Sequence, residues 1–176
     1  MICYKSCCAE DIREGLFEGF LRRQNVTKCW RKENGEWTVK DDPFIDDWSE
    51  SDRRALLVHL RELLAAGGFV CAAFDQGRLK GFASVSPAWF GAGREYLDLT
   101  NLHVSEDLRR NGVGRTLFLT AAQWAKRKGA KKLYISAHSA VESQAFYRAM
   151  GCREAEVCNQ KHVEEEPFDC QLEYLL

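Results

Sequence analysis

The chain has 176 residues, enough for one domain with a hydrophobic core, and its composition is ordinary for a soluble globular protein. Its 25 basic and 26 acidic residues nearly cancel, which argues against a dedicated nucleic-acid binder. No apolar run approaches about 18 residues. The first residues also lack the charged-then-apolar order of a signal peptide. We therefore expect a cytoplasmic protein with no membrane span.

The chain contains eight cysteines, at positions 3, 7, 8, 29, 71, 152, 158 and 170. They form no Cys-x-x-Cys pair, and the four histidines show no zinc-site spacing, so we expect no metal site. Several cysteines lie inside apolar patterns, and we expect most of the eight to be small buried hydrophobic residues in a reducing compartment. A cysteine-based redox protein is an alternative that the missing Cys-x-x-Cys pair disfavours.

In the first half of the chain, apolar periodicity predicts helices over residues 9–23 and 51–66. Ser49 or Ser51 would cap the second helix, and Gly67-Gly68 would end it. Between the helices, Asn34-Gly35 predicts the turn of a β-hairpin with arms at 28–31 and 37–40. Two strands are then expected, at 69–74 and 79–85.

An acidic segment between residues 41 and 52 stands beside three tryptophans. Its acids are Asp41, Asp42, Asp46, Asp47, Glu50 and Asp52, and the tryptophans are Trp30, Trp37 and Trp48. Acids and aromatic rings together could attract and cage a cationic amine. Alternatively, the segment is a solvated loop that feeds acids into a helix start, with the tryptophans packed in the hairpin. The sequence favours the second interpretation.

The next strand, 96–104, changes phase part-way along its length. Its apolar residues stand at odd positions first and at even positions later: Leu97 and Leu99, then Leu102 and Val104. Because side chains alternate between the faces of a strand, this shift predicts a β-bulge near Thr100-Asn101. The opposite face would then carry Tyr96, Asp98 and His103.

Alternating helices and strands complete the chain. A helix over 113–128 would end at Gly129, and a strand over 132–136 follows it. A short helix over 140–150 would be capped by Gly151, and two closing strands are expected at 153–160 and 168–175. This order predicts an α/β (α+β) fold with a mixed sheet covered by helices, in a single domain over 1–176.

The segment from Arg109 to Gly114 joins the strand to the 113–128 helix and contains two glycines. A strand, a glycine-bearing turn and a helix start make a cradle for a pyrophosphate, because backbone N–H groups and the helix dipole both favour negative charge there. A Rossmann site would need glycine at position 117, which is Leu. A Walker P-loop would need glycine at 109 and lysine at 115, and both positions are Arg.

The pattern Arg-x-x-Gly-x-Gly, with Val104 five residues before Arg109, resembles the acyl-CoA motif of the GNAT superfamily of N-acetyltransferases. A second block, Ser139–Cys152, resembles that family's helix ending in Phe-Tyr-x-x-x-Gly-Phe, with Cys152 in place of the last aromatic residue. The resemblance is specific over residues 95–152, the acyl-CoA-binding core. It is weak over residues 1–66, and residues 1–68 would form the variable, substrate-side portion.

The resemblance implies a mostly antiparallel, twisted sheet with helices on both faces, and acetyl-CoA as the co-substrate. The CoA pyrophosphate would bind at the turn that begins with Arg109. Its ligands there would be the backbone amides of Arg110, Asn111, Gly112, Val113, Gly114 and Arg115. The pantetheine arm would pair with the strand edge at Leu102, His103 and Val104, where a backbone N–H would polarise the thioester carbonyl. Ser143 could hydrogen-bond near the pantetheine or face solvent.

The resemblance also places Tyr147 near the thioester sulfur, as the general acid that protonates the CoA thiolate. A phenol, with a pKa of about 10, is protonated at neutral pH and can donate. The alternative is a tyrosine that only packs in the core. Asp98 stands where some family members place a catalytic carboxylate, but it could equally be a salt-bridged strand residue. Glu95, His103, His138 and a water chain are lesser candidates for the base.

The sequence therefore predicts an N-acetyltransferase that transfers acetyl directly, within a ternary complex, to a primary amine of a small molecule or peptide. We expect no nucleic-acid or membrane partner, and a monomer or homodimer. A non-catalytic CoA-binding or regulatory module of the same fold is the alternative.

Overall fold

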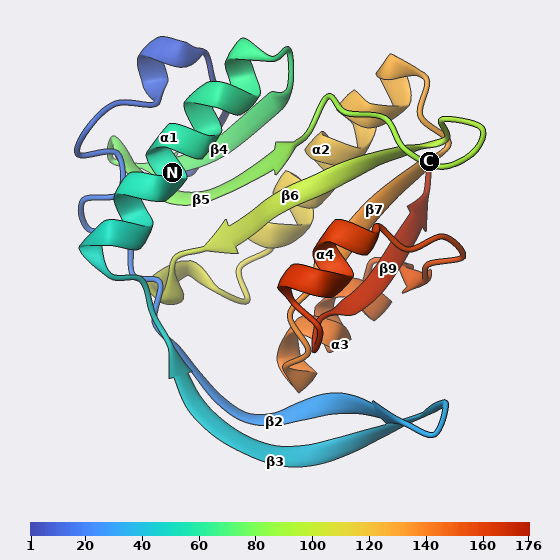
Figure 1. The fold of residues 1–176 in the computed structure, drawn as a ribbon. Helices are drawn as coiled ribbons and strands as arrows, with labels where there is room; N and C mark the ends of the chain where they lie inside the picture. Colours follow the sequence, from blue (N-terminus) through green and yellow to red (C-terminus); the bar gives the residue numbers. More distant parts are fainter.

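The computed structural model describes all 176 residues and contains a seven-stranded sheet, a separate two-stranded sheet and four α-helices (Figure 1). The strands of the large sheet, in spatial order, are β1 (Cys3–Ser6), β4 (Phe69–Asp75), β5 (Arg78–Val85), β6 (Tyr96–Val104), β7 (Lys132–Ala137), β9 (Cys170–Leu175) and β8 (Arg153–Glu154). The hairpin is β2 (Gln24–Glu33) with β3 (Glu36–Asp46). The helices are α1 (Glu50–Ala65), α2 (Val113–Lys128), α3 (Val141–Ala149) and α4 (Gln160–Glu165). The predicted mixed, mostly antiparallel α/β fold is confirmed, with β6 and β7 as the parallel pair.

The helices cover the two faces of the large sheet, as Figure 1 shows. Helix α2 lies on one face and buries Leu117, Phe118 and Ala121 against the central strands, with α3 packed beside it. Helix α1 lies on the opposite face with Leu57, Leu60 and Leu63 buried over β4 and β5, and α4 shares that face over β7 and β9. Strand β6 therefore lies between α1 and α4 on one face and under α2 on the other.

The predicted bulge in β6 is confirmed. Asn101 stands opposite Ser84 of β5 whereas Leu99 stands opposite Val85, so Thr100 is the additional residue. Its hydroxyl lies 2.7 Å from that of Ser84. The bulge keeps the apolar side chains of both halves of β6 on the α2 face, although their phase differs.

Most of the other predicted elements are confirmed to within a few residues at each end. Ser49 caps α1 by accepting a hydrogen bond from the backbone N–H of Asp52 at 3.1 Å. Asn34 and Gly35 both have positive φ at the hairpin turn, which is the conformation that the two-residue turn requires. Gly129 ends α2 with a φ of 97°.

The predicted helix over 9–23 is wrong. Only residues 9–11 form a 3-10 helix, and turns follow. Gly15 and Gly19 adopt φ values of 79° and 74°, a left-handed conformation that an α-helix cannot include. The apolar side chains of Ile12, Phe17 and Phe20 are nevertheless buried. The spacing of apolar residues therefore indicated burial correctly, but it did not indicate a helix.

The predicted strand over 153–160 is also wrong, since β8 has two residues and α4 begins at Gln160. Helix α4 is six residues long and contains a single apolar residue, Val163, which is too little to show a helical period. Asn159 caps it by accepting a hydrogen bond from the backbone N–H of Lys161 at 3.2 Å.

The expectation that most cysteines are buried was too strong. Four are buried, at 29, 71, 152 and 170, while Cys7 is half-buried and Cys3, Cys8 and Cys158 are exposed. All eight are free thiols. No group of three or more His, Cys, Asp or Glu side chains is arranged to hold a metal ion. None of the helices is long and apolar enough to cross a membrane.

Candidate active site

The parallel strands β6 and β7 pair over only three residues and then part. Tyr96 to Asp98 pair with Lys132 to Tyr134, and beyond Asp98 the strand β6 pairs with β5 alone. Strand β7 meanwhile continues to Ala137 paired with β9. The side of β6 that faces β7 is therefore an unpaired edge over residues 99–104, and the predicted residues Leu102, His103 and Val104 lie on it.

The glycine turn lies just beyond the free end of β6, and α2 begins in it. Arg110 and Gly112 have positive φ values of 63° and 77°, which turn consecutive backbone N–H groups to one side. None of the six backbone N–H groups from Arg110 to Arg115 donates to an acceptor in the protein. Most of this segment is exposed. It is a set of free donors at a helix N-terminus, the arrangement that favours a phosphate group.

The side chain of Arg109 holds this turn in place. Its Nε donates to the backbone carbonyl of Val104 at 3.2 Å, and its Nη2 donates to the carbonyl of Arg22 at 3.0 Å. Both bonds point the guanidinium toward the protein. A Cβ on Gly114 would stand 3.4 Å from the Phe146 ring and 3.5 Å from Val104, so a larger side chain there would press on both α3 and β6.

Helix α3 brings Tyr147 and Ser143 to the α2 face beside the parted strands. The Tyr147 ring packs edge-on against Phe118 and Phe146, with centroids 6.2 and 5.2 Å away. Its hydroxyl makes no hydrogen bond to the protein, and burial raises the pKa of the phenol above its ordinary value. Ser143, one turn earlier, is half-buried. The side chain of Tyr147 is thus both packed and free to donate.

Asp98, the predicted carboxylate, lies on the opposite face and bonds to a histidine of α4. His162 Nε2 lies 2.5 Å from Asp98 Oδ2, and the second carboxylate oxygen is buried without a partner. The hydrogen bond to Asp98 raises the pKa of His162. The side chain of Asp98 is 10% exposed and that of His162 is 25% exposed, so the imidazole lies between the carboxylate and solvent.

A polar network fixes α4 over the sheet. Tyr134 of β7 stacks on the His162 ring, with centroids 6.0 Å apart, and its hydroxyl accepts from the backbone N–H of Asn159 at 3.0 Å. The same hydroxyl bonds to Gln171, whose amide donates to Ser136. The position of His162 is therefore set by β7 and β9 as well as by Asp98.

Comparison with protein families gives one decisive match. Residues 26–152 match the model described as the acetyltransferase (GNAT) family. This range covers all but the first two residues of the hairpin, together with the parted strands, the glycine turn and α3. The chain belongs to the GNAT family of acetyltransferases. No protein of curated function matches it by sequence.

Solved structures confirm the GNAT fold at low sequence identity. A putative streptothricin acetyltransferase from Bacillus anthracis str. Ames, in complex with acetyl coenzyme A, is 16% identical with a TM-score of 0.72, covering 100% of this chain and 97% of that one. A nourseothricin acetyltransferase is also 16% identical, with a TM-score of 0.70 and coverage of 99% and 98%. The PaiA N-acetyltransferase of Thermoplasma acidophilum, in complex with coenzyme A, is 14% identical with a TM-score of 0.62 and coverage of 100% and 99%.

Three lesser candidates for the base are poorly placed in this GNAT chain. Glu95 lies before β6, away from the parted end, and accepts from the backbone N–H of Gly93 at 2.8 Å. His103 is enclosed by Trp48 and Phe82, and burial with nearby Arg22 lowers its pKa to about 3. His138 Nδ1 accepts from the backbone N–H of Ala140 at 3.0 Å, which leaves the neutral ring no free acceptor nitrogen.

Most acids of the 41–52 segment are engaged by partners of their own. The favoured interpretation of this segment as a solvated loop is only partly right, because Asp41, Asp42 and Asp46 lie in β3, although Glu50 and Asp52 do stand in the first turn of α1. Asp46 pairs with Arg22, Asp42 with Arg31, Asp41 with Lys28 and Glu50 with Arg54. The tryptophans do not form a cage. Trp48 stacks on Phe20, while Trp30 and Trp37 receive the cations of Arg148 and Lys32.

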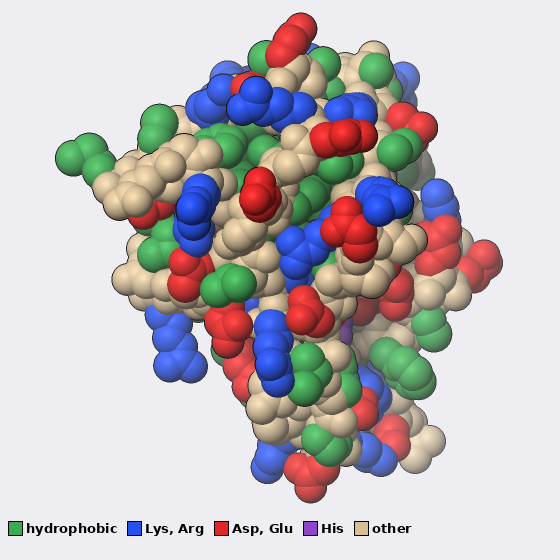
Figure 2. Space-filling model, turned by 90° about the vertical axis from the view of Figure 1, so that its left-hand side faces the viewer, with side chains coloured by type: hydrophobic (Ala, Val, Ile, Leu, Met, Phe, Trp, Pro, Cys, Tyr) green, Lys and Arg blue, Asp and Glu red, His purple; other side chains and the backbone are tan.

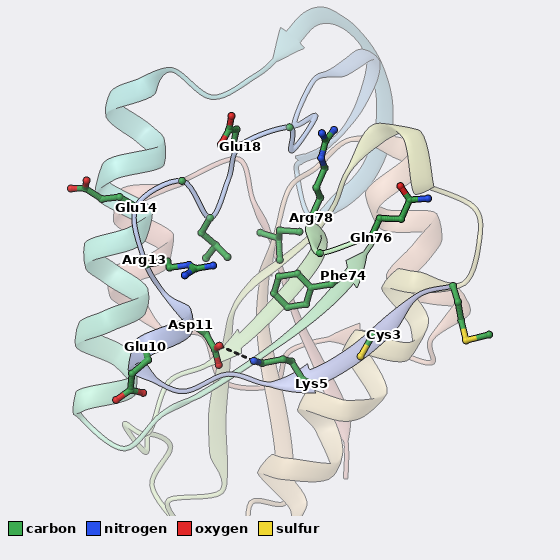
Figure 3. A pocket seen from close by; sticks show the side chains of 16 residues that line it. Cys3, Lys5, Glu10, Asp11, Arg13, Glu14, Glu18, Phe74, Gln76 and Arg78 are labelled. Atoms are coloured by element: carbon green, nitrogen blue, oxygen red, sulfur yellow. Dashed lines mark hydrogen bonds and ion pairs between the residues drawn. The ribbon is translucent and has the colours of Figure 1, made fainter.

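A cleft of about 1130 Å³ lies at the end of the large sheet formed by β1 (Figure 3). It is bounded by β1, by the 10–19 segment and by the turn between β4 and β5. Lys5 and Asp11 form an ion pair of 2.7 Å at its side, and Arg78 rises from the turn. Figure 2 shows this end of the molecule, where side chains of both charges are interspersed around hydrophobic ones. No free donor array or parted strand adjoins it, so the candidate site is not there.

The residues that the sequence predicted to contact acetyl-CoA lie in the region that the structure brings together. The sequence did not point to His162. The histidine lies 64 positions from Asp98, in the segment between the two predicted closing strands, for which the sequence predicted no element. Only the prediction that Asp98 faces away from the leucines pointed to a partner on that side of the sheet.

Proposed function

We propose that this GNAT protein transfers the acetyl group of acetyl-CoA to a primary amine of a small molecule or peptide, with both substrates bound together. One observation carries the proposal. The parallel strands part after Asp98, and the free edge of β6 leads directly to six unpaired backbone N–H groups at the start of α2. An extended molecule with a diphosphate at one end and amides along its length matches both features.

The residues present fit the CoA moiety. The positive φ values of Arg110 and Gly112 aim the amides that would hold the pyrophosphate, and the exposed Arg115 adds positive charge beside them. The unpaired edge at 102–104 would pair with the amides of the pantetheine arm, as an added strand does. Bound in this way, acetyl-CoA would supply a thioester between β6 and β7.

Tyr147 would supply the proton that the departing thiolate takes. Its raised pKa keeps the phenol protonated at neutral pH, and its hydroxyl has no competing partner in the protein. The acceptor would approach from the opposite face, where α1 and α4 flank β6 and where Asp98 and His162 lie. This division gives each substrate its own face of the sheet, which supports direct transfer in a ternary complex.

Two of the similar structures are described as nourseothricin and streptothricin acetyltransferases, and a third as PaiA N-acetyltransferase. Their low identities carry no acceptor over to this chain. They do, however, justify a test panel that contains nourseothricin beside simple primary amines and a lysine-containing peptide.

The test is binding followed by turnover. Acetyl-CoA at about 100 times its Kd should stabilise the protein by about 2.7 kcal/mol, read as a rise in melting temperature. Mass spectrometry should then detect an acetylated amine from the panel. Thiol-release dyes are unsuitable because Cys3, Cys8 and Cys158 are exposed and would react. Binding without any acetylated product would favour the non-catalytic module, and the absence of binding would refute the proposal.

A further inference from the structure

We propose that His162 is the group that takes the proton from the acceptor ammonium, and that Asp98 positions its imidazole for that step. This inference rests on the proposed acetyltransferase function and names the missing base of that site. His162 is a residue of α4, outside the two sequence blocks that resemble GNAT motifs. The inference comes from the geometry of α4 over the parted strands.

The hydrogen bond between the two residues settles the tautomer of the ring. An ionised carboxylate can only accept, so the Nε2 that lies 2.5 Å from Asp98 Oδ2 carries a hydrogen. In the neutral ring the Nδ1 atom then holds the free lone pair. No protein donor bonds to Nδ1, and the side chain is 25% exposed. His162 therefore presents a free acceptor nitrogen with the opposite side of its ring held in place.

The pair lies where β6 and β7 part. Asp98 is the last residue of β6 that pairs with β7, and its partner there, Tyr134, stacks on the His162 ring. This is the face opposite Tyr147, which packs against Phe118 on the α2 side. A thioester held between the strands would thus have a proton donor on one face and a proton acceptor on the other.

The surroundings of His162 make it a suitable base. Asp98 raises its pKa, Glu165 of the same helix acts in the same direction, and Lys161 acts against it. Just before β9, Asp169 lies near enough that His162 acts to lower the pKa of its carboxyl, which burial raises. From β7, the neutral Tyr134 phenol completes the contacts. A raised pKa makes the imidazole a stronger base, within the pH range in which an enzyme operates.

Asp98 itself is not placed to take the proton. One carboxylate oxygen is committed to His162, and the other is buried without a partner under α4. The carboxylate acts through the imidazole, by fixing its tautomer and by stabilising its protonated form. We therefore assign the predicted base position, Asp98, a positioning role.

The ammonium gives one proton to His162 Nδ1, which passes it to solvent. The nitrogen lone pair forms the N–C bond to the acetyl carbon, and the C–S bond breaks with its electron pair on sulfur. The sulfur takes the Tyr147 proton, and the second proton lost by the nitrogen as the amide forms returns to Tyr147 through solvent. The products are an N-acetyl amine, free CoA and one proton.

The test is His162→Gln, assayed on the best acceptor of the amine panel, with His59→Gln as the matched control. His59 is an exposed histidine on α1. We expect His162→Gln to lower kcat by about 100-fold or more. The acetyl-CoA thermal shift should be unchanged, and the acidic limb of the pH profile should disappear. His59→Gln should retain the wild-type kcat. An active wild type with full kcat in His162→Gln would overturn the inference while leaving the proposed function intact.

Two further measurements separate a base from a structural residue. Free imidazole should restore part of the activity of His162→Ala, which loss of a packing residue would not allow. Asp98→Asn should move the acidic limb to lower pH, because it removes the charge that stabilises the imidazolium. Nitrogen NMR of the full-length protein needs no acceptor and should show a hydrogen on Nε2 of neutral His162. A hydrogen on Nδ1 in that spectrum would overturn the inference whether or not an acceptor is known.

Discussion

The two faces of the sheet at the parted strands are built in different ways. On the α2 face, the free amides from 110 to 115 and Tyr147 come from two short stretches of chain, each next to a strand of the split. On the α4 face, Asp98 and His162 stand 64 residues apart and meet only through the fold. The face proposed to bind acetyl-CoA depends on local backbone geometry. The face proposed to bind the amine depends on side chains held by long-range contacts. Substitutions on the two faces should therefore affect activity and stability in different ways.

The largest effect is expected on the α2 face, from Tyr147→Phe. Removing the hydroxyl removes the proposed proton donor to the thiolate, so kcat should fall by roughly 10² to 10⁴ with acetyl-CoA affinity unchanged. Steady-state kinetics with the best panel amine, and calorimetry for acetyl-CoA, measure the two quantities. Tyr174→Phe is the matched control, because Tyr174 also packs on Phe118, with centroids 5.1 Å apart. Equal kcat in both variants would show that Tyr147 is not the proton donor to the CoA thiolate.

The next effect concerns stability on the α4 face, where Glu173 is fully buried. It accepts hydrogen bonds from Tyr96, from Arg153 Nε at 2.9 Å and from Lys132 at 3.1 Å. Glu173→Gln leaves Lys132 and Arg153 with only the exposed Glu156 as a charge partner and should cost about 3 kcal/mol of unfolding free energy. Glu165→Gln breaks an exposed pair of 3.9 Å with Lys161 and should cost about 0.5 kcal/mol or less. Urea denaturation at pH 7 compares them.

The same carboxylate gives the stability a defined pH dependence. Burial alone would raise the pKa of Glu173, but the hydrogen bonds from Tyr96 and Arg153 lower it to about 2, from 4.5. A lowered pKa means that the stabilisation is complete above pH 4.5 and is lost as pH falls toward 2. The difference between wild type and Glu173→Gln should therefore shrink between pH 5 and pH 3. An undiminished difference at pH 3 would mean that Glu173 does not titrate in this window.

The same contrast explains what the sequence could and could not predict. The glycine turn, the hairpin at Asn34-Gly35 and the bulge at Thr100 were predicted because each leaves its signal within a few consecutive residues. The partnership of Asp98 with His162 leaves no local signal, because α4 is a six-residue polar helix. The 9–23 segment shows the converse error, since its apolar period was real but Gly15 and Gly19 prevent a helix.

A smaller effect is expected from the glycines at the two ends of α2. Gly112 and Gly129 both have positive φ, of 77° and 97°, and both have open space where a Cβ would go. Alanine at either position should cost about 1–2 kcal/mol from backbone strain. Only Gly112→Ala should also weaken acetyl-CoA binding, by about tenfold or about 1.4 kcal/mol, because the strained turn shifts its free amides. Calorimetric titration measures the affinity for acetyl-CoA. Equal affinities in the two variants would contradict the proposal that the amides of this turn bind the pyrophosphate.

The smallest effect tests whether the acceptor side extends into the hairpin. Asp41 is 85% exposed and lies 3.8 Å from an exposed Lys28, a pair that should contribute less than about 1 kcal/mol. Asp41→Asn should therefore leave both the unfolding free energy and the KM for a cationic amine nearly unchanged. A clear rise in KM would support the interpretation that the acids and tryptophans attract a cationic amine, and would place part of amine recognition on the hairpin. An unchanged KM would favour recognition of the ammonium on the face that Asp98 and His162 share, where the buried carboxylate of Asp98 acts at short range.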